Sequence, residues 1–314
     1  MVPRRMEMED ETTSARWRRW ADESRQVARV WFSRSDIPSG AAGWPAKAGQ
    51  MYDIFGTQSV FGEESLFLNF GYWKNNPTTL DEASRDLARL VAESGDFNTS
   101  DIVVDCGTGY GDQDILWANE FGVKHITGVN VAPRQIEIST RRVEEAGLAD
   151  RIDYVHASAT HLPQDDASCT KVVALESAMH FPSRVEFFSE ALRVLKPGGR
   201  LVTADIVPKR TFLNARHRKE VDRLGWRGAS QKAVRRAANV DAYRELLLDV
   251  GFAEAETRSI AGDIFRPLAR FLSKSLFAPD RKYVNPMVRW TFRPDNFWLN
   301  EWHVDYILAV AQKK

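Results

Sequence analysis

Three glycines at alternate positions form the sharpest motif of the chain. They lie in Val103-Val104-Asp105-Cys106-Gly107-Thr108-Gly109-Tyr110-Gly111, where a short apolar run leads into a turn and then a helix. Glycines let the backbone approach a ligand closely, and a helix N-terminus offers free N–H groups. A dinucleotide fingerprint would space its glycines as G-x-G-x-x-G, and Asp105 would be badly placed against a pyrophosphate. The loop instead suits a ligand with a cationic amino-acid part.

His180 and Asp205 have side chains that could move a proton together. His180 follows the apolar run 171–175, and Asp205 lies at the end of the run 200–206. If both runs are parallel strands, their ends meet at one edge of the sheet. The imidazole could then take a proton from a substrate hydroxyl while the carboxylate orients the ring and balances its charge. An ordinary loop histidine and a strand-end aspartate are the structural alternatives.

Strands and helices alternate along the middle of the chain. The expected strands are 101–105, 125–131, 152–156, 171–175 and 200–206, with helices at 80–94, 112–121, 133–146 and 184–194. Thr79 is a suitable N-cap for the first helix. A helix at 241–248 and strands at 253–260 and 303–311 complete the pattern. This order is typical of a Rossmann-like α/β fold. We expect a seven-stranded, mostly parallel sheet with helices on both faces, in which 303–311 is the antiparallel strand.

The composition is that of an ordinary globular protein of 314 residues, 43% apolar and 27% charged. Lys plus Arg equals Asp plus Glu at 43 each, so no net charge favours nucleic acid as a partner. No apolar run approaches the roughly 20 residues of a membrane helix, and the N-terminus lacks the apolar core of a signal peptide. Two cysteines make neither a disulfide framework nor a metal site. We expect a cytoplasmic protein without a membrane partner or a metal, and leave a homo-oligomer open.

Over about residues 80–310 the chain resembles the class I methyltransferases, whose cofactor is S-adenosyl-L-methionine (SAM). Four pieces in the same order carry the resemblance: the glycine loop, Gly-Val-Asn-Val at Gly128, Ala-x-x-Leu-Pro at Ala159 and Leu-Lys-Pro-Gly-Gly at Leu195. The resemblance implies that the glycine loop holds the methionine part of SAM. It implies that Asn130, where the family usually has an acid, meets the ribose, and that Ser158-Ala159 replaces the usual Asp-Ala pair at the adenine.

A closer resemblance links Ala174 to His180, together with Thr203 to Ile206, to bacterial sugar and macrolide O-methyltransferases of the rebeccamycin type. It implies a small-molecule substrate, with His180 as the base and Asp205 as its partner. The segment Asn69 to Trp73 is similar to the one that lines the SAM cleft in those enzymes. Together the two resemblances imply cofactor contacts from Tyr72, Trp73, Asp105, Gly107, Thr108, Gly109, Asn130, Val131, Gln135, Ser158, Ala159 and Glu176.

Two other functions stay open at this point. Terpenyl C-methyltransferases have a Glu-Ser-x-Met stretch like Glu176 to Met179, and in that hypothesis Glu176 is catalytic and steadies a carbocation made from a prenyl diphosphate. Aromatic residues within 263–301 would wall the pocket, and the basic stretch 209–236 would hold the diphosphate. A SAM-binding protein without catalysis is the second alternative. Methylation of ribosomal RNA is not expected, because the net charge is zero and no Asn-Pro-Pro-Tyr motif is present.

The chain divides into four predicted parts. Residues 1–79 form an N-terminal tail and helical cap, and 80–206 form the Rossmann-like SAM-binding core. Residues 207–240 form a helical lid insertion. Residues 241–314 return to the core and carry the aromatic-rich insertion 263–301.

Overall fold

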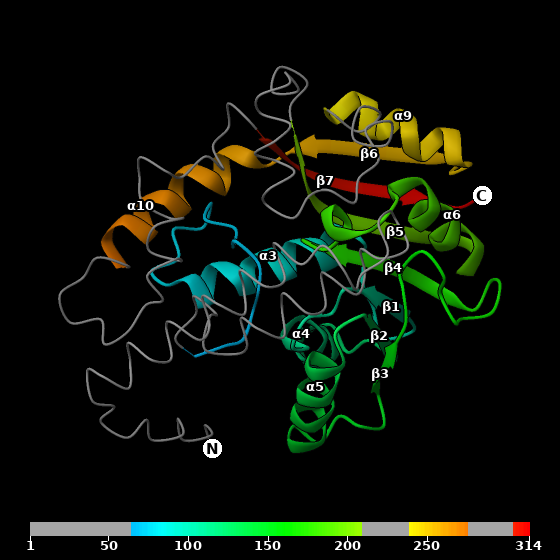
Figure 1. The fold of residues 1–314 in the computed structure, drawn as a ribbon, viewed down its shortest axis with the longest axis horizontal. Coiled ribbons are helices and arrows are strands. Elements are labelled where there is room, and N and C mark those ends of the chain that lie inside the picture. The colour runs from blue at the N-terminus through cyan, green and yellow to red at the C-terminus, as the bar shows by residue number, and fades with distance from the viewer. Residues whose placement is uncertain (1–63, 209–238, 276–303) are drawn as a thin grey trace, which may run out of the picture.

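The computed structural model describes residues 64–208, 239–275 and 304–314. These residues build a seven-stranded sheet with helices on both faces (Figure 1). The strands run in the order β3-β2-β1-β4-β5-β7-β6 across the sheet. Their bounds are β1 Ile102–Cys106, β2 His125–Asn130, β3 Ile152–His156, β4 Cys169–Leu175, β5 Leu195–Pro208, β6 Glu254–Ser259 and β7 Val304–Gln312.

The strand directions confirm the expected sheet. The strands β1 to β5 are all parallel to one another, whereas β7 runs antiparallel to both β5 and β6. β7 lies one strand in from the edge, and Asp205 of β5 pairs with Ile307 of β7. β5 is longer than predicted, because Leu195 pairs with Cys169 of β4 ahead of the register shift between Cys169 and Lys171. The Pro-Gly-Gly turn expected before this strand therefore lies within it.

The described α-helices lie close to their predicted bounds, except for α10, which was not predicted and lies in the aromatic-rich insertion. They are α3 Leu80–Ser94, α4 Asp112–Glu120, α5 Pro133–Glu145, α6 Arg184–Val194, α9 Val240–Val250 and α10 Phe265–Ser275. The Thr79 side chain accepts a hydrogen bond from the Glu82 backbone N–H, which confirms the predicted N-cap of α3. At the end of α5, Gly147 has a φ of +69°, a left-handed conformation that terminates a helix readily.

Alternate residues of the central strands pack into two separate hydrophobic cores, one on each face of the sheet. Val103 of β1 packs with residues of α3, α4, α5 and α10 on one face. Val104, the next residue, packs with α6 and α9 on the other face. Figure 1 shows the same layering of helices around the sheet. Because helices cover both faces of the sheet, the ends of the strands remain available to bind a ligand.

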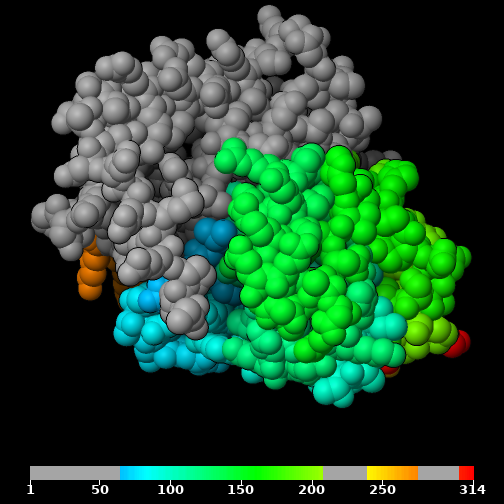
Figure 2. Space-filling view, turned by 90° about the horizontal axis from the view of Figure 1, so that it is seen from below, coloured from blue at the N-terminus to red at the C-terminus, as the bar shows by residue number. Residues whose placement is uncertain are grey.

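The segment 64–79 precedes α3 without forming a helix or strand of its own. Its backbone is tied to α3, since the Tyr72 N–H donates to the Ala83 carbonyl, and the Ser65 N–H donates to the Asp81 carboxylate over 2.9 Å. In the space-filling view, the blue and cyan residues that begin the described chain lie against the green residues of the core (Figure 2).

Large parts of the predicted cap and insertions lie outside the described residues, namely 1–63, 209–238 and 276–303. The basic stretch 209–236 and most aromatics of the second insertion fall there. The four-part division of the chain therefore stays a prediction. None of the helices in the described ranges is long and apolar enough to cross a membrane.

Candidate active site

Three acidic residues lie at the carboxyl ends of three neighbouring strands. Asp105 is near the end of β1, Glu176 directly follows β4, and Asp205 lies in β5. The sheet order places β1, β4 and β5 side by side at its centre. In parallel α/β sheets this edge is where ligands bind. The expectation that these residues share one edge is therefore consistent with the topology.

The glycine loop is held tightly against the segment that follows β4. Gly107 has a φ of +87°, and a Cβ there would lie 2.3 Å from the Cβ of Ser177. The hydroxyl of Ser177 donates to the carbonyl of Cys106, which ties the loop to β4 from the other side. A residue other than glycine at 107 would push these two segments apart. A glycine at position 107 therefore serves the close packing of the loop as well as the access of a ligand to it.

Asp105 lies beneath this loop and has no exposed surface. One of its oxygens, Oδ2, accepts from the Gln113 side-chain amide over 2.9 Å. Burial raises the pKa of Asp105 well above its ordinary value, and the charge of Asp114 adds to this effect. Asp105 therefore faces the protein interior. Its charge and its hydrogen bonds would affect a ligand above the loop through the loop itself.

Asn130, at the end of β2, is largely occupied by local hydrogen bonds. Its Oδ1 accepts from the backbone N–H groups of Val131 at 2.7 Å and Ala132 at 3.2 Å. Its Nδ2 donates to the Oε1 of Gln135 over 2.9 Å. The Nε2 of Gln135 is buried and has no hydrogen-bond partner among the residues that the structure describes. The amide donor available for a cofactor at this point is therefore that of Gln135, with Asn130 holding it in place.

The loop after β3 carries the predicted adenine contacts. The Ser158 hydroxyl lies 2.9 Å from the Thr160 hydroxyl, and it also accepts from the Thr160 N–H at 3.3 Å. Ala159 between them is buried. The Ser158 side chain thus shapes the loop, and contact with adenine by Ser158 or Ala159 stays a prediction.

Glu176 joins three segments that are far apart in the sequence. Its Oε1 accepts from the Phe70 backbone N–H at 2.7 Å and from the Tyr306 hydroxyl at 2.8 Å. Its Oε2 is buried without a hydrogen-bond partner in the described parts of the chain. The backbone adopts a φ of +48°, which is strained for a residue with a side chain. Burial raises the pKa of Glu176 to about 8, although both hydrogen bonds act in the opposite direction.

The predicted cleft residues Tyr72 and Trp73 are both buried in the core next to Glu176's segment. The Trp73 backbone N–H donates to the Asp263 carbonyl, and its ring lies 5.1 Å from that of Phe271 in α10. The indole N–H donates to the Phe70 carbonyl over 3.0 Å. These bonds fix the segment that supplies the Phe70 N–H to Glu176. Direct contact of Tyr72 or Trp73 with a cofactor stays a prediction.

Asp205 has a different principal partner from the one predicted. Its carboxylate receives two hydrogen bonds from the Arg184 guanidinium, Nε to Oδ2 at 2.6 Å and Nη2 to Oδ1 at 3.1 Å. The Tyr243 hydroxyl also donates to Oδ2, over 3.1 Å. Both oxygens therefore accept hydrogen bonds from Arg184 or Tyr243, and the role of Asp205 in orienting the His180 ring stays a prediction. Sequence reasoning missed Arg184, which follows the N-cap Ser183 at the start of α6.

His180 ends a short 3₁₀ helix, η3 Ala178–His180, directly after β4. Loss of solvent lowers the pKa of His180 to about 4. The charge of Asp205 raises this pKa, whereas that of Arg184 lowers it. The imidazole is therefore neutral near pH 7 and able to accept a proton.

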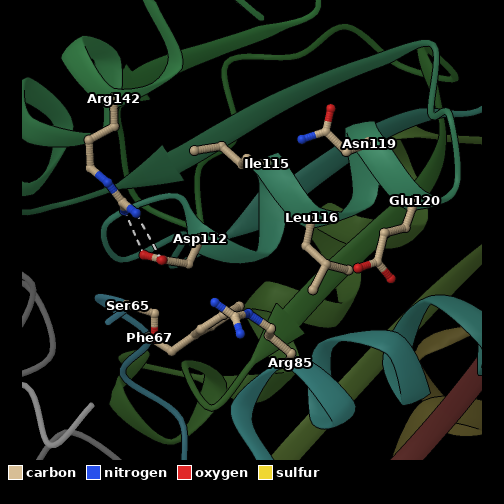
Figure 3. A pocket seen from close by; sticks show the side chains of 9 residues that line it. All are labelled: Ser65, Phe67, Arg85, Asp112, Ile115, Leu116, Asn119, Glu120 and Arg142. Carbon is tan, nitrogen blue, oxygen red and sulfur yellow. Dashed lines mark hydrogen bonds and ion pairs between the residues drawn. The ribbon is translucent and has the colours of Figure 1, made fainter. Parts of the chain in front are cut away.

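A surface hollow of about 220 Å³ lies away from these residues. Arg142 and Asp112 form an ion pair on its wall (Figure 3). It is lined by Ser65, Phe67, Arg85, Asp112, Ile115, Leu116, Asn119, Glu120 and Arg142. None of the predicted site residues lines it, so we do not assign the active site to it. No group of three His, Cys, Asp or Glu side chains in the described ranges could hold a metal ion.

Residues 104–203 match a family described as a methyltransferase domain. Over 234 residues the chain is 31% identical to erythromycin 3''-O-methyltransferase of Saccharopolyspora erythraea, covering 71% of this chain and 73% of that protein. The chain belongs to the SAM-dependent methyltransferases. This methyltransferase is also 33% identical over 227 residues to 27-O-demethylrifamycin SV methyltransferase of Amycolatopsis mediterranei, with 71% and 79% of the two chains covered.

Solved structures place the methyltransferase in the same fold. The crystal structure of the [4+2]-cyclase SpnF aligns with a TM-score of 0.67 at 23% identity, covering 89% of this chain and 99% of that one. Because that protein is a cyclase, the fold by itself does not decide the activity. The sequence relatives decide the activity, and they identify an enzyme that uses SAM and acts on a small molecule.

The residues at the strand ends fit SAM. The cofactor carries a cationic amino-acid part and an adenosine part. Two buried polar atoms, the Nε2 of Gln135 after β2 and the Oε2 of Glu176 after β4, have no hydrogen-bond partner among the described residues. Buried polar groups are almost always paired in native proteins, so unpaired ones at the strand ends are consistent with a ligand there. A hydrogen-bond donor on one side and a carboxyl oxygen on the other match the hydroxyl and ammonium groups of SAM.

Proposed function

We propose that the methyltransferase transfers the methyl group of SAM to a hydroxyl group of a macrolide- or glycoside-like natural product, with His180 as the general base. The observation that carries this proposal is the likeness to two O-methyltransferases across 71% of the chain. Their names place erythromycin and a demethylated rifamycin among the acceptors of such enzymes. A hydroxyl group is a poor nucleophile, so a base beside it would accelerate the reaction.

In this proposal the cofactor is held by the predicted residues with two refinements from the structure. The loop of Gly107, Thr108 and Gly109 takes the methionine part. Gln135, held by Asn130, binds the ribose, and the backbone after it contributes through Val131. Ser158 and Ala159 remain the proposed adenine contacts. The opposite wall of the cofactor site is formed by Tyr72, Trp73 and Glu176.

The chemical step needs one proton acceptor in its neutral form. Bound SAM supplies a methyl group on a sulfonium. As the acceptor oxygen forms its bond to the methyl carbon, the carbon–sulfur bond breaks and its electron pair stays on sulfur. The hydroxyl proton passes to the imidazole of His180, which is neutral because its pKa is about 4. Asp205, paired with Arg184, lies near enough for its charge to act on His180 and offset the positive charge that forms there.

The test compares His180→Ala with His125→Ala on the intact enzyme. His125 lies in β2, where its ring contacts Asp153 at 2.6 Å, away from the proposed base. Methylation of a panel of hydroxylated macrolides and glycosides is followed by mass spectrometry, and SAM affinity by calorimetry. His180→Ala should lower turnover by roughly 10²–10⁴-fold. SAM affinity should stay nearly unchanged, and His125→Ala should behave as the wild type. Full activity of His180→Ala would remove the base assignment.

C-methylation of a prenyl diphosphate is the competing proposal, and Glu176 discriminates between the two. A carboxylate that steadies a carbocation must be ionised, whereas a pKa of about 8 keeps Glu176 mostly neutral at pH 7. This observation supports O-methylation. If the enzyme instead methylates a prenyl diphosphate, and Glu176→Gln abolishes that reaction while His180→Ala spares it, the C-methyltransferase hypothesis stands.

We further propose that the enzyme acts in the cytoplasm and without nucleic acid. The equal numbers of basic and acidic residues, 43 of each, support the second part. Retention of the protein on a heparin column at physiological salt would argue against it.

A further inference from the structure

Two buried carboxyl groups, those of Asp105 and Asp114, lie close together beneath the glycine loop. Asp105 belongs to the predicted cofactor site, whereas Asp114 does not. We propose that Asp114 is a further residue of the cofactor site, which shares one proton with Asp105 and so sets the charge beneath the loop that binds SAM. No motif in the sequence assigns a role to Asp114. The proposal concerns cofactor affinity and does not depend on the identity of the methyl acceptor.

The geometry first shows that the two carboxyl groups are isolated from water. Asp105 of β1 and Asp114 in the first turn of α4 each have no exposed surface. The Gln113 amide donates to the Oδ2 of Asp105 over 2.9 Å and to the Thr108 carbonyl over 3.0 Å. The Thr108 hydroxyl donates to the Oδ2 of Asp114. Both carboxyl groups are thus anchored to the loop through the same residue, Thr108.

A proton shared between the two carboxyl groups would give the second oxygen of each a partner. The Oδ1 atoms of Asp105 and Asp114 have no hydrogen-bond donor among the described residues. The charge of Asp114 nevertheless raises the pKa of Asp105, so the two carboxyl groups lie close together. Two carboxylates cannot hydrogen-bond to one another, whereas an acid and a carboxylate can. Buried carboxyl groups in contact cannot both ionise near neutral pH, so one proton stays between them.

The surroundings determine when a second proton joins the first. Burial raises the pKa of Asp114 to about 6, while the hydrogen bond from Thr108 and the neighbouring Tyr154 hydroxyl lower it and the charge of Asp112 raises it. Asp112 is itself paired with Arg142 of α5 at 2.6 Å. The pKa of Asp105 lies well above its ordinary value. Above about pH 6 the pair therefore holds one proton and one negative charge, and below it the pair becomes neutral.

The charge of the pair acts on the cofactor because SAM is a cation. Its sulfonium and ammonium groups together outweigh its carboxylate by one positive charge. A negative charge beneath the loop favours SAM, and a second proton on the pair removes that charge. SAM affinity should therefore fall as the pH falls through about 6. For one linked proton the fall is at most about tenfold per pH unit.

The experiment measures SAM binding to the full chain by calorimetry between pH 5.5 and 7.5, in buffers of different ionisation enthalpy. We expect the wild type to bind SAM about three- to tenfold more weakly at pH 5.5 than at pH 7.5, with proton release on binding near pH 6. Asp114→Asn removes the carboxyl group that titrates near pH 6, so its affinity at pH 7.5 should fall about three- to tenfold, to that of the wild type at pH 5.5, and its pH dependence should flatten. Asp153→Asn, a substitution in β3 with a side chain 48% exposed, controls for the loss of one charge elsewhere.

Tyr154→Phe provides a second arm that keeps the carboxyl pair intact. Because the Tyr154 hydroxyl lowers the pKa of Asp114, its removal should shift the loss of affinity to higher pH, opposite to the flattening expected of Asp114→Asn. The proposal is overturned if wild type, Asp114→Asn and Tyr154→Phe release the same number of protons and share one pH profile. Histidines would then account for the titration. All readouts are binding measurements, so they stay informative if the proposed O-methylation proves wrong.

Discussion

Replacing Arg184 by Met should strongly destabilise the methyltransferase, because it would leave a carboxylate alone in the core. Arg184 is 3% exposed and Asp205 has no exposed surface. The guanidinium makes two hydrogen bonds to Asp205 and a third to the Ile206 carbonyl over 3.3 Å. Methionine matches the length of the apolar stem and removes the charge. Of the donors to Asp205, the substitution leaves the Tyr243 hydroxyl.

The size of the effect follows from this burial. Burial by itself would lower the pKa of Arg184, yet Asp205 raises it above its ordinary value, so the guanidinium stays charged in the folded protein. Removing one partner of such a pair typically costs about 3–5 kcal/mol of unfolding free energy. The double variant with Asp205→Asn leaves no isolated charge. It should therefore lose less than the sum of the single variants, by roughly 2–3 kcal/mol.

Urea unfolding of the four proteins at pH 7.5 measures these free energies, provided the transitions are two-state. Arg193→Met is the matched control, because Arg193 is 32% exposed and forms ion pairs with Asp166 and Glu190 at the surface. The control should lose less than about 1 kcal/mol. If Arg184→Met costs no more than Arg193→Met, or if the two core substitutions are additive, the reasoning from the buried pair is refuted.

Three further predictions concern other parts of the site and its support. Because the pKa of Glu176 is about 8 in the folded protein and about 4.5 ordinarily, folding favours its protonated form. The wild type should then lose about 1.4 kcal/mol of unfolding free energy per pH unit relative to Glu176→Gln as the pH rises between those values; parallel urea-derived profiles would contradict this. Gly107→Ala should abolish SAM binding in calorimetry and destabilise the protein by more than Gly109→Ala, because the added Cβ at 107 meets the Ser177 Cβ at 2.3 Å whereas that at 109 meets the flexible Leu68 side chain at 3.3 Å; equal effects would count against the packing argument. Thr79→Ala should cost about 1 kcal/mol of thermal stability by loss of the α3 cap, and a Thr79→Ser protein should retain most of it.

The sequence was most informative where local patterns decide the structure. The helix 184–194 and the strand 152–156 have the predicted bounds, because N-cap chemistry and short apolar runs act over a few neighbouring residues. The antiparallel strand near the sheet edge was also predictable from the order of elements. β5 was predicted too short, since its first residues are paired through Cys169 of β4. Pairing between distant residues leaves no trace in a local pattern.

Long-range partners of the candidate site could not be read from the sequence for the same reason. The positions of Glu176 and Asp205 at strand ends were predictable, but their partners lie far along the chain. Phe70 and Tyr306 reach Glu176 from 106 and 130 residues away. Tyr243 is 38 residues from Asp205. A tyrosine in an apolar strand such as β7 reads as a core residue, and only the fold shows that its hydroxyl meets a carboxyl group.

The pairing of Asp205 with Arg184 changes the expected properties of the proposed base. An aspartate dedicated to His180 would hold the pKa of the imidazole near or above its ordinary value, so that part of the enzyme would carry a protonated, inactive histidine at neutral pH. With Arg184 beside it, Asp205 belongs to a neutral pair, and desolvation lowers the pKa of His180 to about 4. The base is then unprotonated whenever a substrate arrives, although each proton transfer has less driving force. Such an arrangement suits methyl transfer, in which the methyl donor is a cationic sulfonium that leaves as a neutral thioether, and the hydroxyl proton needs to be removed only as the new bond forms.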